Sequence, residues 1–419
     1  MNRRSDAFFD FLGTLRRYYF GFFRKESFRN LKKYINHGGY DIFFLVLLVI
    51  LLATGLIMMF SASYVNALYD AGTISTGGDP YYYFKKQLGF VIAGLVVMFL
   101  FSRIKIEVFE GLTNVYFIFC LILLALVFVF PAHTGKDEFY RWVDLPGLPS
   151  FQPSEFAKIG LIMYCAWSLT KRKALIEKEW WAIIPTLFMV AVVCVLILLE
   201  NHLSCTVIMF CLGVSMTYLG GAKNKTYILG LTAVAVLAFF AVESGLLKDY
   251  AEGRIDIWKK LITDQELTNE ELLNNGWQIT QSLYAIGSGG LFGLGFGNSK
   301  QKHLYLPEPQ NDFVFAIVSE ELGYIRAIII MIIFILFVAR GFQIALRSKN
   351  RYGSLVAMGI CFQIGLEAAL NMAVVTATVP NTGISLPFFS YGGTAMFTLL
   401  AEVGLVLSVS RDTTKPMKG

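Results

Sequence analysis

The sequence predicts an all-α polytopic membrane protein with ten transmembrane helices. Hydrophobic residues make up 56% of the 419 residues, charged residues only 16%, and the mean hydropathy is +0.58. Apolar runs long enough to cross the roughly 30 Å of bilayer hydrocarbon recur along the chain. The short alternating segments of a membrane β-barrel are missing from the pattern, so helices are the only element expected to span the bilayer.

The apolar runs place the ten predicted helices in order along the chain. The fifth and sixth are separated only by the polar residues Glu200, Asn201 and His202. The predicted spans are 42–60, 87–101, 114–131, 155–170, 182–199, 203–219, 227–246, 311–340, 354–376 and 394–410.

The distribution of Lys and Arg predicts the orientation. These residues gather in the N-terminal tail, in alternate short loops and in the C-terminal tail, whereas the other short loops hold fewer. By the positive-inside rule, both termini are predicted to face the cytoplasm. The net charge of +6 therefore reflects membrane topology and anionic lipid, and no nucleic-acid partner is expected.

Three regions follow from this pattern. Residues 1–40 form a cytoplasmic segment that interleaves basic and aromatic residues, either an interfacial helix or a disordered tail. Residues 41–410 form the ten-helix membrane domain, and residues 411–419 form a cytoplasmic tail. The membrane domain has two long loops on the non-cytoplasmic side, residues 132–154 and 247–310, and loops of such length are usually functional.

The second half of the loop 247–310 is rich in glycine. Six glycines lie between Gly287 and Gly297, but no Gly-Lys-Ser/Thr follows them and no strand precedes them. A P-loop or dinucleotide site is therefore excluded. Two interpretations stay open: a backbone that lies close to a lipid-linked pyrophosphate, or a purely structural re-entrant turn.

Cysteine and histidine offer no metal site. The six cysteines all fall in predicted spans without metal or disulfide spacing, and are expected to pack as small apolar residues. The four histidines are scattered and form no ligand set.

Charged residues near or inside apolar helices are the main functional signal. Asp312 stands at the mouth of the eighth span, where a carboxylate is costly to place and chemically useful. Glu155 and Lys158 are three apart and share a helix face. Helical geometry predicts that Glu320 shares the cavity of Asp312. Glu321 and Arg326 are expected to form an ion-pair network that fixes packing.

Short motifs in a characteristic order carry a family resemblance from about residue 40 to 410. They are Arg141-Trp142, Phe151-Gln152-Pro153-Ser154-Glu155 with Lys158, Gln281-Ser282, Ala285-Ile286-Gly287-Ser288-Gly289-Gly290, Gln301-Lys302, Tyr305-Leu306-Pro307-Glu308, Asp312-Phe313, Glu320-Glu321-Leu322-Gly323, Asn371, Thr382-Gly383, Leu386-Pro387-Phe388 and Ser390-Tyr391-Gly392-Gly393. The chain resembles the SEDS proteins (shape, elongation, division and sporulation), which include FtsW, RodA and SpoVE. The segment from Tyr305 to Gln310 is most like the division and sporulation branch.

The resemblance implies a ten-helix fold and peptidoglycan glycosyltransferase activity on lipid II. It also implies a class B penicillin-binding protein transpeptidase as partner, together with divisome or sporulation proteins. The implied location is the bacterial cytoplasmic membrane, with the division septum as the candidate place. The chain departs from the family pattern at Asn311, at Glu138-Phe139-Tyr140, at Glu200-Asn201-His202 and at Arg326. The third departure replaces a Gln/Glu-Pro-Asp motif and puts any role of that Asp in doubt.

The chemistry of lipid II polymerisation matches the charged residues. The reaction joins the 4-hydroxyl of one disaccharide to the anomeric carbon of another with inversion, and it needs a base, which Asp312 can supply. The leaving undecaprenyl pyrophosphate gathers negative charge and needs cations. Arg141, Lys302 and Lys158 are the candidate cations. A divalent metal ion, Mg²⁺ or Mn²⁺, is the one candidate cofactor.

The sequence therefore predicts a catalytic Asp312 surrounded by a set of substrate-binding residues. That set is Arg141, Trp142, Glu155, Lys158, Gln281, Lys302, Glu308, Glu320, Ser390 and Tyr391. Ser390 and Tyr391 either line the cavity or only form the turn into the last helix. Because a polyprenyl tail stays in the bilayer, we expect a membrane-facing cleft at Asp312, with Glu155 and Lys158 near its floor.

Two functions of other classes remain as alternatives. A lipid II flippase needs a continuous path through the bundle lined by polar residues at the membrane midplane. A scaffold that only recruits the penicillin-binding protein does not require Asp312. The long loops and the position of Asp312 at the membrane surface favour the enzyme.

Overall fold

The structure is a computed structural model, and it describes residues 34–36, 38–70, 75–130, 141–144, 150–222, 248–263, 265, 268 and 276–413. Within these ranges the chain is almost entirely helical. The β-pairing in this part of the chain consists of two isolated bridges, Ile35 with Ile104 and Val143 with Phe151. The predicted all-α class is confirmed.

The described ranges contain the following helices, in chain order. They are α2 (Ile42–Leu68), α3 (Tyr82–Arg103), α4 (Ile106–Leu126), α5 (Pro153–Lys171), α6 (Lys173–Ile176), η2 (Trp180–Ile183), α7 (Ile184–Leu199), α8 (Leu203–Leu219), α10 (Lys248–Ile262), α12 (Trp277–Gly289), α13 (Val314–Arg347), α14 (Arg351–Val375) and α15 (Gly393–Thr413).

Seven helical segments in the described part of the chain are long and apolar enough to cross a membrane, namely α2, α3, α4, the continuous segment Trp181–Leu199 of η2 and α7, α13, α14 and α15. The predicted spans 155–170 and 203–219 also form helices. However, α5 carries Glu155 and Lys158, and α8 has only 17 residues. The predicted span 227–246 lies outside the described residues, as do most of the predicted N-terminal segment 1–40 and of the tail 411–419.

The last helix occupies the centre of the bundle. Of the candidate spans, α15 is the most enclosed, with 83% of its apolar window buried, whereas α3 has only 17% buried. Yet α3 packs closely along α15, and α14 packs beside α13. Large apolar side chains such as Ile92, Val96 and Phe99 on α3 are therefore exposed on the outside of the bundle. An apolar helix surface of this kind is suited to contact with lipid.

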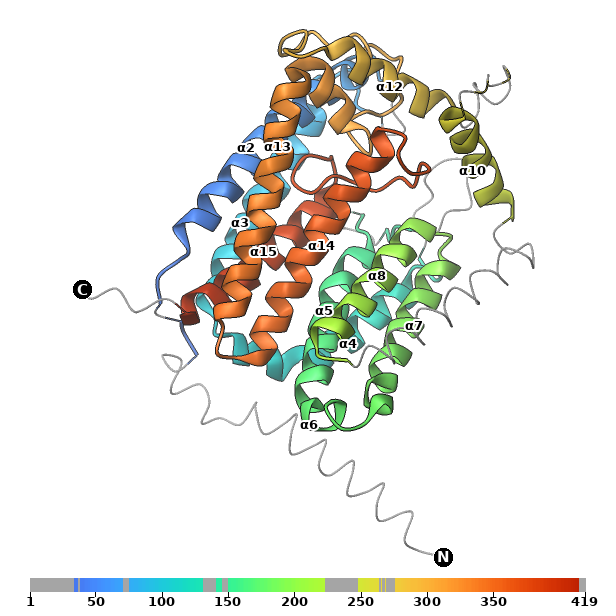
Figure 1. The fold of residues 1–419 in the computed structure, drawn as a ribbon. Helices are drawn as coiled ribbons and strands as arrows, with labels where there is room; N and C mark the ends of the chain where they lie inside the picture. Colours follow the sequence, from blue (N-terminus) through green and yellow to red (C-terminus); the bar gives the residue numbers. More distant parts are fainter. Residues whose placement is uncertain are drawn as a thin grey trace, which may run out of the picture.

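The two described ends of the chain meet at one end of the bundle. Asp41, the N-cap of α2, forms an ion pair with Arg340 at 2.7 Å. The side chain of Asn36 donates to the carbonyl oxygen of Ser408 at 2.9 Å, and Arg411 donates to the carbonyl oxygen of Asn36 at 2.6 Å. This end is opposite α10 and α12 in Figure 1. Its assignment to the cytoplasmic side stays a prediction.

The glycine-rich segment packs against a break in α13. Gly323 interrupts the helix with φ +81° and ψ 172°. Backbone hydrogen bonds join the two segments, from Leu294 N to Glu320 O at 3.0 Å and from Tyr324 N to Gly290 O at 2.9 Å. A Cβ on Gly323 would lie 2.2 Å from the backbone nitrogen of Gly293. This part of the glycine-rich segment therefore lies against protein backbone, which favours the structural interpretation.

We expect Gly323→Ala to destabilise the protein strongly. A positive φ with an extended ψ is essentially restricted to Gly and costs on the order of 1–3 kcal/mol for other residues, and the new Cβ would overlap the Gly293 backbone. The matched control is Gly89→Ala in α3, where a Cβ meets nothing within 4 Å. Thermal unfolding in detergent should show a large drop in Tm for the first variant only. Equal Tm values would contradict this account of the break.

Candidate functional site

Asp312 lies two residues before α13, outside the membrane-spanning segments, and its side chain is partly exposed. Its backbone carbonyl accepts a hydrogen bond from Nδ2 of Asn371 at 2.7 Å. The same nitrogen donates to the carbonyl oxygen of Ile384 at 2.6 Å. Asn371 is fully buried on α14, so it ties Asp312 to the segment that leads into α15.

The surroundings of Asp312 favour a base that works near neutral pH. Burial, together with the nearby Glu308 carboxylate, raises the pKa of Asp312 to about 6, although Arg141 and Arg254 act in the opposite direction. Glu308 accepts a hydrogen bond from Nδ2 of Asn311 at 2.7 Å. A carboxylate with a pKa in this range is largely ionised at pH 7 and still basic enough to take a proton from a hydroxyl.

Arg141 connects Asp312 to the turn between α7 and α8. Its Nη2 donates to the carbonyl oxygen of Asn201 at 2.8 Å. Burial raises the pKa of Glu200 to about 8, against the effect of Arg141. Burial also lowers the pKa of His202 to about 3, helped by Arg141 and Lys158. Both side chains are thus mainly neutral at pH 7, and the sequence that departs from the family motif lies beside the site.

Lys158 is held by carboxylates inside the bundle. Its Nζ lies 2.8 Å from Oε2 of Glu155 and 2.8 Å from Oε1 of Glu367, and all three side chains are almost fully buried. Gln363 bridges from Glu367 to Glu402 with two hydrogen bonds of 3.4 Å. Glu367 and Glu402 were not predicted from the sequence. The sequence does contain a signal for them, because each is a carboxylate within a predicted apolar span, where it needs a buried partner.

The segment before Asp312 contacts the start of α15. The backbone nitrogen of Tyr391 donates to the carbonyl oxygen of Gln310 at 2.7 Å, and Asn66 donates to the Gln310 side chain at 3.0 Å. The Tyr391 ring packs edge-on against Tyr83, with 4.8 Å between centroids. Oγ of Ser390 accepts from the backbone nitrogen of Leu386 at 2.7 Å. These contacts favour the interpretation of Ser390 as part of a helix-entry turn.

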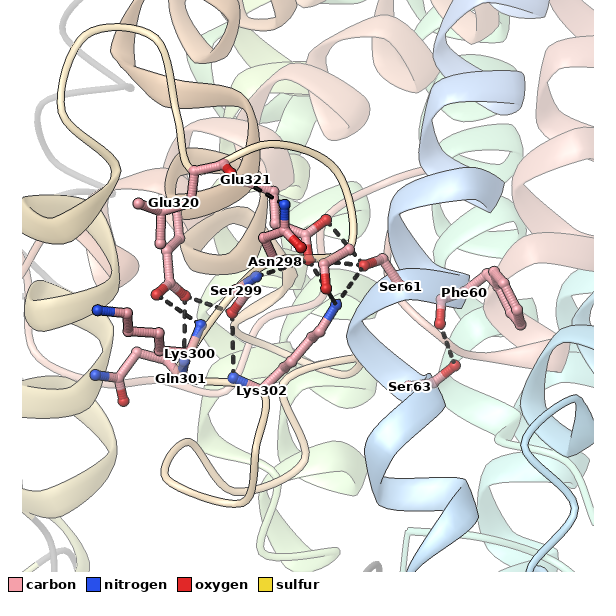
Figure 2. Close-up of polar contacts among 12 residues, drawn as sticks. Phe60, Ser61, Ser63, Asn298, Ser299, Lys300, Gln301, Lys302, Glu320 and Glu321 are labelled. Atoms are coloured by element: carbon pink, nitrogen blue, oxygen red, sulfur yellow. Dashed lines mark hydrogen bonds and ion pairs between the residues drawn. The ribbon is translucent and has the colours of Figure 1, made fainter.

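Lys302 is engaged away from Asp312. Figure 2 shows its ammonium between Glu321 and Ser61, with Oε1 of Glu321 at 2.8 Å and Oγ of Ser61 at 3.1 Å. It also donates to the carbonyl oxygen of Gly297 at 2.7 Å. Lys302 is 3% exposed and Glu321 is fully buried. This ion pair joins the loop to α2 and α13, and it leaves Lys302 little freedom to bind a pyrophosphate.

Glu320 holds the same loop from the other side. Its carboxylate accepts hydrogen bonds from the Lys300 backbone nitrogen at 2.9 Å, from Oγ of Ser288 at 3.1 Å and from Oγ of Ser299. The expected placement in the Asp312 cavity assumed that both residues lie on one helix. Because α13 begins only at Val314, that geometry does not apply.

The remaining predicted residues occupy peripheral positions. Arg326 is exposed and donates to the carbonyl oxygen of Phe292 at 2.8 Å, instead of joining the expected ion-pair network. Trp142 is half-buried between Arg141 and the Val143 bridge. Gln281 is buried on α12.

The fold and the site together define the class of protein: a polytopic helical membrane protein with a carboxylate and arginines at one end of the bundle. The family model of the cell cycle proteins FtsW, RodA and SpoVE matches residues 41–415. The chain belongs to this family.

Named relatives extend along most of the chain. Stage V sporulation protein E of Bacillus subtilis (strain 168) is 36% identical over 372 residues, which cover 88% of this chain and 97% of the relative. A protein of Geobacter sp. (strain M18) named probable peptidoglycan glycosyltransferase FtsW is 34% identical over 375 residues, which cover 89% of this chain and 97% of the relative.

Solved structures show the same fold. The rod shape determining protein RodA of Thermus thermophilus is 25% identical with a TM-score of 0.63, covering 90% of this chain and 98% of RodA. A chain from a structure described as the structural coordination of polymerization and crosslinking by a peptidoglycan synthase complex is 26% identical with a TM-score of 0.69. That match covers 90% of this chain and 98% of the other.

Proposed function

We propose that this protein is an inverting peptidoglycan glycosyltransferase that polymerises lipid II in cell division or sporulation. The observation that carries the proposal is Asp312, a partly exposed carboxylate at one end of the bundle whose pKa is lowered by Arg141 and Arg254 against the effect of burial. The names of the relatives, peptidoglycan glycosyltransferase FtsW and stage V sporulation protein E, support both the activity and the process.

In the proposed reaction Asp312 acts as the general base. One oxygen of its carboxylate takes the proton from the 4-hydroxyl of the acceptor disaccharide, and the oxygen of that hydroxyl attacks the anomeric carbon of the donor. The new glycosidic bond forms as the bond from carbon to the pyrophosphate oxygen breaks. Undecaprenyl pyrophosphate leaves with the electron pair, and Arg141 is placed to stabilise its charge. Lys158 and Lys302 serve the scaffold, because each is held by buried carboxylates.

The membrane placement is part of the same proposal. We assign ten spans, cytoplasmic termini and a multi-pass location in the bacterial cytoplasmic membrane, at the septum if the chain serves division. The Asp312 end then faces outward, where lipid II is presented. The substrate tail enters sideways from the bilayer, since moving a polyprenyl chain out of hydrocarbon costs roughly 0.8 kcal/mol per CH₂.

A class B penicillin-binding protein is the proposed partner. The neighbour with the TM-score of 0.69 comes from a complex described as coordinating polymerization and crosslinking. A transpeptidase that crosslinks new strands would be the matching second activity.

A divalent cation, Mg²⁺ or Mn²⁺, is the proposed cofactor. The described residues contain no group of three or more His, Cys, Asp or Glu side chains that could hold a metal ion. Titrating Mg²⁺ or Mn²⁺ into the polymerisation assay will show whether the reaction needs one.

The decisive experiment is to incubate the full-length protein with lipid II, alone and with a class B penicillin-binding protein from the same cell, and to look for glycan polymer. Polymer that requires Asp312 supports the enzyme. Transport of lipid II across proteoliposomes without polymer would favour the flippase. Absence of both activities with retained binding to the partner would favour the scaffold.

A further inference from the structure

Helix α10 is anchored to the segment between α14 and α15 by two side chains. Nη1 of Arg254 donates to the carbonyl oxygen of Asn381 at 3.1 Å, and Nε1 of Trp258 donates to the carbonyl oxygen of Ala377 at 3.0 Å. Residues four apart on a helix lie on one face, so both bonds come from the same side of α10. These two hydrogen bonds therefore fix α10 against the segment between α14 and α15.

The segment that holds α10 also supports Asp312. Oδ1 of Asn381 accepts from the backbone nitrogen of Gly383 at 3.2 Å, and Nδ2 of Asn381 donates to Gln278 of α12 at 3.2 Å. A Cβ on Gly383 would lie 3.0 Å from Oδ2 of Asp312. Hydrogen bonds thus lead from Arg254 through Asn381 to Gly383, whose backbone lies close to the carboxylate of Asp312.

We infer that Arg254 is a positioning residue of the reaction: α10 holds its guanidinium near Asp312 and keeps that carboxylate ionised, the form that accepts the proton. The inference rests on the proposed role of Asp312 as base. Helix α10, in the first half of the loop 247–310, would thus serve the reaction through Arg254.

Few charged groups act on Asp312, so the loss of Arg254 is expected to change the pKa of this carboxyl group. Glu308, from the segment before α13, raises the pKa of Asp312, whereas Arg141, between α4 and α5, and Arg254, on α10, lower it. The neighbouring α14 and the segment before α15 contribute the uncharged Asn371 and Gly383. Without Arg254, only Arg141 would oppose burial and Glu308, so the pKa of Asp312 would rise above its value of about 6.

The test compares pH profiles of lipid II polymerisation by the full-length protein with its penicillin-binding protein. For Arg254→Gln we expect the acidic limb to move upward by on the order of one pH unit. If Asp312 titrates near pH 6, the rate there falls roughly fivefold, and it approaches the wild-type rate about two pH units higher. Arg254→Lys keeps a cation and should retain most of the wild-type profile.

Lys259→Gln is the matched control, because it removes a cation from the same helix. Lys259 is 65% exposed and pairs with Asp256 at 3.9 Å, and we expect its profile to match the wild type. A uniform rate loss for Arg254→Gln at every pH, or an unchanged acidic limb, would overturn the inference while leaving the proposed activity in place. Lack of polymer from the wild-type complex would instead overturn the proposed activity, and this inference with it.

Discussion

Replacing Asp312 with Asn is expected to abolish glycan polymerisation. The amide keeps the size of the side chain but cannot take the proton from the acceptor hydroxyl. A positioned general base contributes roughly 10²–10⁴-fold to a rate, so residual polymer should fall at least about a hundredfold. Folding should be retained, because the carboxylate is partly exposed and Asn371 binds its backbone carbonyl instead.

The measurement is polymer length and yield from lipid II, with Tm and membrane insertion recorded for each variant. Asp256→Asn provides the matched control, since this carboxylate lies on α10 with its side chain 61% exposed. Long glycan at a near-normal rate from Asp312→Asn would remove Asp312 from the role of base.

Replacing Lys158 with Met is expected to cause a large loss of stability. The substitution leaves Glu155 and Glu367 buried without their shared cation. Breaking a buried ion pair by removing one partner typically costs about 3–5 kcal/mol, because an uncompensated charge remains. Glu402 and Gln363 next to the pair offer no positive charge to replace it.

A mutant cycle separates this effect from simple loss of contact. Adding Glu155→Gln and Glu367→Gln to Lys158→Met removes the unpaired charges, and we expect it to restore much of the unfolding free energy. Lys171→Met on the same helix is the control: its pair with Glu110 is partly exposed, and such pairs contribute about 0–1 kcal/mol. Additive effects of the Lys158, Glu155 and Glu367 changes would show that these charges are not coupled.

The sequence predicted the helical class because long apolar runs permit only one structure in a bilayer. It also predicted the pair of Glu155 and Lys158, which the structure confirms, since charges next to apolar helices are visible in a linear pattern. The catalytic role of Asp312, chosen by the same pattern, stays a prediction. The positions of the helix ends were less accurate. The third predicted span, 114–131, is α4, which begins at Ile106 and ends at Leu126, because polar residues in its first turns hide the helical continuation.

The partners of each charge could not be read from the sequence. Lys302 looked like a free cation for pyrophosphate, but folding places it between Glu321 and Ser61, which lies 241 positions away in the chain. The placement of Glu320 failed because the helix begins after Asp312. Local spacing describes one helix at a time, whereas these contacts join segments distant in sequence.

By itself, the sequence determined that this chain is a bundle of membrane helices with a carboxylate next to the start of one of them. Both features can be read from neighbouring residues, because hydropathy and the cost of burying a charge depend on the local sequence. Only the tertiary structure decided which charges are available for chemistry. It pairs Lys158 and Lys302 with buried carboxylates and brings Arg141 and Arg254 close enough to Asp312 to lower the pKa of that carboxyl group. The physical reason is that a charge in an apolar interior must find its counter-charge, and packing between distant helices selects the partner.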